Sequence, residues 1–212
     1  MTDLPTPRPS FEYFFDFSSP WSYLADTQVD RFAQAHDATV VRRPILLGGV
    51  FKAIGGPVAP IQTFSANKRS YVLQDLLRFA KWWGEPFQWP TRFPMLTVLP
   101  LRVACQLDLA DPAARAFCAA VFRAYWVEDQ DISTPDTVSA CLHAAGLDPG
   151  PLVEGAADPV IKQRLVANTE EAVTRGVFGA PSFFVGDELF WGQDRLDHVA
   201  RALDAARARS RA

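Results

Sequence analysis

An almost unbroken run of aromatic residues near the start of the chain constrains the fold more than any other feature. Residues 11–17 read Phe-Glu-Tyr-Phe-Phe-Asp-Phe, which is typical of a β-strand buried on both faces. Serine and proline follow, with Ser19 at the expected N-cap and Pro20 at the first helical position, where a missing N–H costs nothing. A helix to about Ala35 and a second strand at 39–43 complete a β-α-β unit, which favours parallel strands.

The middle of the chain predicts helices rather than strands. Glycines and prolines are dense over 47–64, which indicates a loop with short helical turns. Apolar residues then recur at helical spacing from Ser65 to Gly84, and glycine is the residue expected just beyond a helix. Further helices are expected at 97–109, 112–127, 135–145 and 158–175.

The chain returns to strands near its end. Residues 181–185 and 188–191 predict a hairpin with Gly-Asp as its two-residue turn. We expect the last helix to start at Asp194, with Asp197 in its first turn.

The element order predicts an α/β fold in which one domain is split by another. The terminal parts, 11–45 and 176–209, form the α/β domain, and 46–175 form a helical insertion. A length of 212 residues allows one large domain or a small domain with an insertion.

Composition argues against several classes of partner. The chain has 21 Lys and Arg against 24 Asp and Glu, a net charge of −3, so it lacks the basic excess of a nucleic-acid-binding protein. No apolar run approaches the roughly 18–20 residues that span a bilayer, so we expect no membrane partner. Residues 1–10 do not resemble a signal peptide, so we expect a cytoplasmic protein.

The cysteines and histidines give no sign of a metal or redox centre. Three cysteines are spaced like neither a redox pair nor a zinc site, which predicts buried free thiols: Cys105, Cys118 and Cys141. Three histidines are isolated in the sequence, so no metal site is expected: His36, His143 and His198.

Two segments at opposite ends of the chain carry a family resemblance. Residues 15–24, Phe-Asp-Phe-Ser-Ser-Pro-Trp-Ser-Tyr-Leu, together with 179–184 and 191–196, resemble the two ends of DsbA-like thioredoxin-fold proteins. Within that group they are most similar to 2-hydroxychromene-2-carboxylate isomerases and kappa-class glutathione transferases. Weaker matches lie at 47–53 and 68–71, and the resemblance extends from about 11 to 203. It implies a thioredoxin-like fold of the DsbA and kappa type, with a helical insertion.

Ser19 is the candidate catalytic residue. Redox members of the group begin this helix with Cys-x-x-Cys, whereas this chain has Ser19-Pro20-Trp21-Ser22, so dithiol exchange is excluded at that position. A hydroxyl at a helix N-terminus favours anions and can donate to a bound thiolate. From spacing alone, Ser19 also fits an ordinary N-cap. The resemblance implies that it stabilises the thiolate of glutathione, and the lack of a nearby base in the sequence favours a hydrogen-bond donor over a nucleophile.

The resemblance also implies the remaining glutathione contacts. Pro181 is expected to follow a cis bond and to face the helix start, with the backbone of Ala180 pairing with the glutathione peptide. Asp194 would bind the ammonium group, although its position also fits a helix cap. The expected glutathione-binding residues are Ser19, Trp21, Asn67, Ala180, Pro181, Trp191, Gly192, Gln193, Asp194 and Arg195.

A carboxylated substrate requires a cation. Lys52 and Arg92 lie in the two irregular stretches and are the candidates, with Tyr71 as a further contact; each also fits a solvated surface position. An aromatic pocket wall or core packing is expected of four more residues: Trp82, Trp83, Trp89 and Phe93.

These inferences predict a glutathione-dependent isomerase that converts a 2-hydroxychromene-2-carboxylate-type substrate to trans-o-hydroxybenzylidene pyruvate. The partners would be glutathione and a small aromatic carboxylate, and the resemblance implies a homodimer. Two alternatives stay open. One is a kappa-type glutathione transferase or peroxidase, and the other is a redox-inactive thioredoxin-fold binding module.

Overall fold

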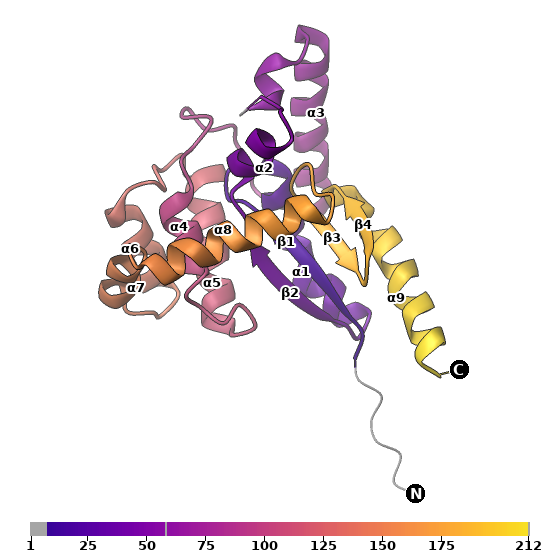
Figure 1. Ribbon diagram of the computed structural model, residues 1–212. Helices are drawn as coiled ribbons and strands as arrows, with labels where there is room; N and C mark the ends of the chain where they lie inside the picture. The colour runs from indigo at the N-terminus through magenta and orange to yellow at the C-terminus, as the bar shows by residue number, and fades with distance from the viewer. Residues whose placement is uncertain (1–7, 58, 212) are drawn as a thin grey trace, which may run out of the picture.

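The computed structural model describes residues 8–57 and 59–211, and this part of the chain contains a four-stranded mixed sheet (Figure 1). Its strand order is β2-β1-β3-β4. β1 (Ser10–Phe15) runs parallel to β2 (Thr39–Pro44) and antiparallel to β3 (Ser182–Val185), which pairs with β4 (Glu188–Trp191). The predicted β-α-β unit and the predicted hairpin are both confirmed.

Successive side chains of the aromatic strand β1 point to opposite sides of the sheet. A hydrophobic cluster covers each side, so the strand is buried on both faces. Tyr13 stacks against Phe183 of β3 at 5.3 Å between ring centroids, in the larger core cluster. Phe14 contacts Phe184 edge-on at 5.5 Å, in a second cluster on the other face. Neither face of the central strand is therefore left to solvent.

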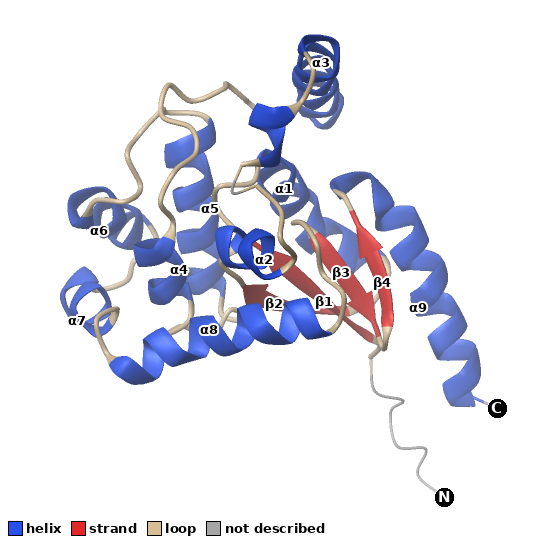
Figure 2. Cartoon of the chain, turned by 45° about the horizontal axis from the view of Figure 1, so that its top comes forward, coloured by secondary structure: helices blue, strands red, loops and turns tan. Residues whose placement is uncertain are grey.

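Helices cover both faces of the sheet. α1 (Pro20–Ala35) and α9 (Leu196–Arg211) lie on one face, while α2 (Leu47–Ala53) and α8 (Pro159–Thr174) lie on the other (Figure 2). The 3₁₀ turn η1 (Pro60–Thr63) leads to α3 (Ala66–Trp83), which projects from the body of the molecule (Figure 1). The remaining helices pack beside the sheet: α4 (Val98–Ala104), α5 (Pro112–Trp126), α6 (Pro135–Ala144) and α7 (Pro149–Gly155).

Several helix boundaries follow from the local signals that predicted them. Ser19 caps α1 and Pro20 is its first residue. Ser65 caps α3 by accepting a hydrogen bond from the Lys68 N–H, and Gly84 ends the helix with φ of +73°. That left-handed conformation is favourable for glycine.

Two boundary predictions were wrong, and one helix was missed. α4 ends at Ala104, not at residue 109, because the Gln106 and Leu107 N–H groups bond three residues back in a tightened last turn. α7 was not predicted, because its Pro-Gly-Pro start obscures the helical pattern. Asp194 does not start the last helix: it lies in the 3₁₀ turn η2 (Gln193–Arg195) before α9.

The helical block and the sheet share one hydrophobic core. Phe122 of α5 packs against Phe15 and Phe17, and the indole N–H of Trp126 donates to the Phe17 carbonyl at 2.8 Å. The division into 11–45 with 176–209 and 46–175 stays a prediction. All three cysteines are buried, as expected. Within the described ranges, no helix has the length and apolar character needed to cross a membrane.

Candidate active site

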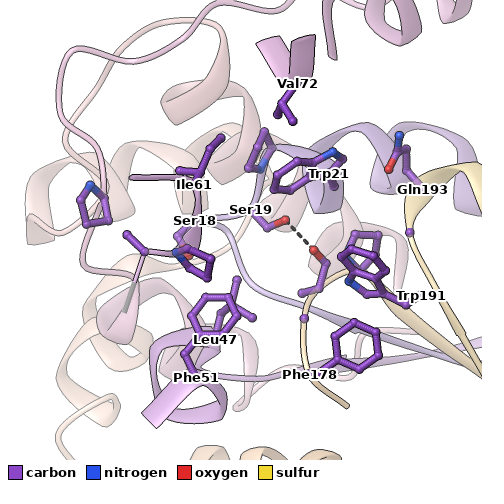
Figure 3. Close-up of a pocket in the computed structure, with 18 of the residues that line it drawn as sticks. Ser18, Ser19, Trp21, Leu47, Phe51, Ile61, Val72, Phe178, Trp191 and Gln193 are labelled. Atoms are coloured by element: carbon purple, nitrogen blue, oxygen red, sulfur yellow. Dashed lines mark hydrogen bonds between the residues drawn. The ribbon is translucent and has the colours of Figure 1, made fainter. Parts of the chain in front are cut away.

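A cavity of about 470 Å³ forms where the start of α1 meets the segment before β3 (Figure 3). The start of α1 supplies Ser19 and Trp21, and the segment before β3 supplies Ala180 and Pro181. The turn after β4 adds a third wall. α2, η1 and α3 enclose the other side, so elements from both the sheet and the helical block build the site.

Ser19 lies on the wall of this cavity at the N-terminus of α1. Its Oγ accepts a hydrogen bond from the Ser22 N–H at 3.1 Å and donates one to the Ala180 carbonyl at 2.8 Å. The side chain is buried against protein on its other sides. Ser19 is thus both a helix cap and a donor aimed across the junction of the two terminal segments.

The side chains that line the cavity offer few reactive groups. Among the described residues that line the cavity, none is a cysteine or histidine. Pro20 has no N–H, and the next N–H of α1, that of Trp21, has no partner within the helix by its position. A helix N-terminus favours negative charge. The site therefore suits an anion that a bound molecule supplies.

A buried carboxylate behind Ser19 fixes the surrounding backbone. Asp16 accepts hydrogen bonds from the Ser18 N–H and hydroxyl, the Thr97 hydroxyl and the Leu47 N–H, at 2.7–3.0 Å. These bonds tie the end of β1 to the starts of α4 and α2. Burial raises the pKa of Asp16, although all four hydrogen bonds oppose that rise.

Sequence analysis did not assign a role to Asp16. A signal was present, because a carboxylate in a segment predicted to be buried on both faces needs buried partners. Its partners Leu47 and Thr97 are distant in the sequence, so the network itself was not visible there.

The segment before β3 has the geometry that the resemblance implied. The Ala180–Pro181 peptide bond is cis, which confirms that expectation. Gly179 packs under the indole of Trp191, whose Nε1 would lie 2.6 Å from a Cβ added at that glycine. Trp191 also contacts Phe178, with 5.0 Å between the ring centroids. Only a residue without a side chain at position 179 leaves room for the indole of Trp191 in the cavity wall.

The turn after β4 brings a charged pair to the cavity. Gly192 has φ of +114°, and an added Cβ would lie 2.6 Å from the Asp194 Oδ1. The Asp194 carboxylate accepts a 2.8 Å hydrogen bond from Arg195. Both residues and the buried Gln193 line the cavity.

Most predicted glutathione contacts come together, but the predicted substrate contacts do not. Four residues are outside the lining of this cavity, and their binding roles stay predictions: Lys52, Asn67, Tyr71 and Arg92. Lys68, Val72 and Asp75 of α3 line it instead, at the spacing of one helical face. Asn67 and Tyr71 each lie one position away from that face. Similarly, Phe51 of α2 lines the cavity, whereas its neighbour Lys52 does not.

Lys68, which sequence analysis did not select as a candidate cation, also lines the cavity. Its ammonium lies 3.8 Å from the ring centroid of Phe64, another lining residue. Arg195, the other cation among the described lining residues, is paired with Asp194.

The four aromatic candidates separate into different environments. Phe93 lines the cavity. Phe93, Trp83 and Trp89 all pack against the main core, and Trp82 is 77% exposed. Core packing is therefore a role of three of them, and Phe93 combines it with a place in the cavity wall.

A β-α-β unit and a hairpin that meet at a helix N-terminus and a cis-proline define the thioredoxin class of folds. Comparison with known proteins agrees: the model of the DsbA-like thioredoxin domain matches residues 11–204. The chain belongs to this family, and the predicted fold class is confirmed.

Individual proteins with similar sequences show which members of this family the chain resembles. A 2-hydroxychromene-2-carboxylate isomerase of Pseudomonas putida is 33% identical, over 91% of this chain and 93% of its own length. Glutathione S-transferase kappa 2 of Caenorhabditis elegans is 26% identical, over 91% of each chain. A solved structure of 2-hydroxychromene-2-carboxylate isomerase has a TM-score of 0.77 at 29% identity, over 93% of this chain and 95% of that one. The resemblance drawn from the end motifs is thereby confirmed.

Proposed function

We propose that this protein is a glutathione-dependent cis-trans isomerase acting on aromatic carboxylates of the 2-hydroxychromene-2-carboxylate type. The observation that carries the proposal is the Ser19 hydroxyl at the N-terminus of α1, hydrogen-bonded to Ala180 in the wall of a cavity with no thiol or imidazole in its described lining. Similarity to isomerases bearing that name supports the substrate class.

The residues present fit glutathione. An extended peptide can pair with the backbone of Ala180, as it would with a strand edge. The Ser19 hydroxyl has a single proton, so it donates to a bound sulfur by turning away from the Ala180 carbonyl, which a peptide N–H of the ligand can then occupy. Asp194 at the cavity edge offers a carboxylate for an ammonium group. The site thus exchanges one internal hydrogen bond for ligand contacts.

Bound glutathione would supply a nucleophilic sulfur, whose reversible addition to the substrate's double bond allows that bond to rotate. Ser19 and the N-terminus of α1 stabilise negative charge at the sulfur position. The Oγ of Ser19 has Ala180 O and Ser22 N as its partners, and neither can accept a proton as a base. We therefore assign Ser19 as a hydrogen-bond donor and not as the nucleophile.

The substrate would occupy the part of the cavity beneath α3. Leu47, Phe51, Val72 and Phe93 give it apolar walls, and Lys68 provides a cation for the carboxylate. Apolar lining with a few placed polar groups is typical of a small-molecule site.

A kappa-type transferase is the second candidate, favoured by the similarity to glutathione S-transferase kappa 2. It would share the sulfur position and use another electrophile. The test is to supply glutathione with either 2-hydroxychromene-2-carboxylate or 1-chloro-2,4-dinitrobenzene and follow each reaction by absorbance. We expect glutathione-dependent turnover of the chromene carboxylate. Turnover of the chlorobenzene alone would favour the transferase, and turnover of neither would favour a binding module.

A further inference from the structure

A second cavity, of about 770 Å³, lies on the other side of α2. Leu47, Gly48 and Phe51 face the first cavity, whereas Gly49 and Lys52 line the second. α4 and α8 form its remaining walls, and neither Ser19 nor the segment before β3 contributes to it. The two cavities therefore share a helix but no lining residue.

Three cations line this second cavity: Lys52 of α2, Arg102 of α4 and Lys162 of α8. Glu170 is the single carboxylate in the described lining. None of the three cations has an ion pair among the residues that the structure describes. The cavity thus carries an excess of positive charge that the protein does not neutralise.

Arg102 is the cation of this cavity that is least satisfied by the protein itself. Its Nε is buried and has no hydrogen-bond partner in the described structure. A buried polar atom without a partner destabilises the protein, because it has lost its hydrogen bonds to water without replacing them. Arg43 also has a buried Nε without a partner, but its guanidinium forms ion pairs with Glu12 and Glu171, whereas that of Arg102 forms none among the described residues. An unpaired guanidinium beside a cavity is what an anion-binding site requires before its ligand arrives.

Apart from Thr169 and Thr174, the rest of the lining is apolar. Leu46, Val98, Leu165 and Val173 form the walls between the cations. The volume falls within the roughly 300–1,000 Å³ typical of small-molecule sites. A bare inorganic anion would leave these walls uncovered, so the lining fits a charged group attached to a ring-sized apolar body.

We propose that the cavity between α2, α4 and α8 binds a small carboxylate with an aromatic or similarly sized apolar body, held by Arg102, Lys52 and Lys162. This site is separate from the one built around Ser19, and the proposal does not depend on the reaction carried out there.

The test is a titration of the ¹⁵N-labelled full chain with 2-naphthoate, followed by amide chemical shifts. We expect saturable shifts at Lys52, Arg102, Thr169 and Val173, with a Kd on the order of 1 mM or lower. Arg102→Gln and Lys162→Gln should each weaken binding at least about fivefold, as loss of a charge-assisted contact does. Lys81→Gln, at the exposed end of α3, is the matched control, and neutral 2-naphthamide should bind more weakly.

Each other outcome overturns the proposal. Shifts confined to Ser19, Trp21, Pro181 and Trp191 would place the carboxylate in the first cavity alone. Equal affinity of the wild type and both variants would show that the cations do not hold it, as would equal affinity for the amide. Absence of any saturable shift would also reject it. Melting temperatures and the spectra of the free variants establish that they are folded.

Discussion

The Ser19 hydroxyl donates a 2.8 Å hydrogen bond to the Ala180 carbonyl, and this one contact joins the first helix to the segment before the last hairpin. The antiparallel pairing of β1 with β3 brings the two residues together, because both segments leave the sheet at the same end. The candidate site therefore depends on the completed sheet rather than on either terminal segment alone.

Replacing Asp16 should destabilise the fold. Asp16→Asn keeps the shape of the side chain but replaces one acceptor oxygen with a donor, which leaves buried donors from Leu47 or Thr97 unpaired. We expect a loss of about 3 kcal/mol in the free energy of unfolding, measured with urea. Asp187→Asn, in the exposed hairpin turn, is the control. Equal stability of the two variants would show that the Asp16 network does not support the fold.

Stability should depend on pH through a second buried carboxyl, Asp26 of α1. Burial raises its pKa from 3.8 to about 6, outweighing Arg42, whose guanidinium lies 3.7 Å away. The folded protein therefore holds this proton more tightly than the unfolded chain. Its stabilising contribution is complete below pH 3.8 and is lost as the pH rises through about 6.

Asp26→Asn removes this titration. Between pH 4 and 7, the wild type should lose about 2 kcal/mol of unfolding free energy relative to the variant. Chemical denaturation at several pH values gives the unfolding free energy of both proteins. The contributions of the other titrating groups cancel in the difference between the wild type and the variant. A constant difference across this range would contradict the raised pKa of Asp26.

Gly192→Ala should disturb the turn that presents Asp194. Alanine is strained at a φ of +114°, and its Cβ would displace the Asp194 carboxylate. We expect a several-fold rise in the KM for glutathione and a loss of about 1–2 kcal/mol in stability. Gly150→Ala is the control, because an added Cβ there makes only an ordinary 3.6 Å contact. An unchanged KM for glutathione would remove this turn from the binding site.

Lys68 should determine the affinity for the substrate carboxylate. Lys68→Gln removes the cation on the α3 face of the cavity, and we expect the KM for the chromene carboxylate to rise about tenfold. The KM for glutathione should stay near its wild-type value. Lys81→Gln on the same helix is the control. If Arg92→Gln raised the substrate KM and Lys68→Gln did not, the sequence-based choice of Arg92 would stand instead.

The parts of the fold that short-range signals determine could be predicted from the sequence. Ser19 and Pro20 mark the start of α1, Gly84 marks the end of α3, and Gly186-Asp187 marks the hairpin turn. In each case the signal lies within a few residues of the boundary. α7 has a capping Asp148, but its prolines and glycine hide the apolar spacing.

The side chains that line the site were harder to predict from sequence. A helix turns about 100° per residue, so an uncertainty of one position moves a side chain to another face. Lys68 lines the first cavity and Asn67 does not; on α2, Phe51 lines the first cavity and Lys52 the second. The Asp16 network joins three elements that are distant along the chain. Such contacts depend on how distant segments pack together, and a local sequence pattern does not predict them.

The ionisation of glutathione bound to the protein tests the role of Ser19 most directly. Thiolate absorbance is followed against pH for the wild type, Ser19→Ala and Ser19→Thr, each saturated with glutathione. In the wild type, the thiol pKa should lie at least about one unit below the ordinary cysteine value of about 8.5. Ser19→Ala should return it toward that value, with a parallel fall in isomerase turnover, and Ser19→Thr should retain part of the shift. An unchanged thiolate fraction and undiminished turnover in Ser19→Ala would contradict the account.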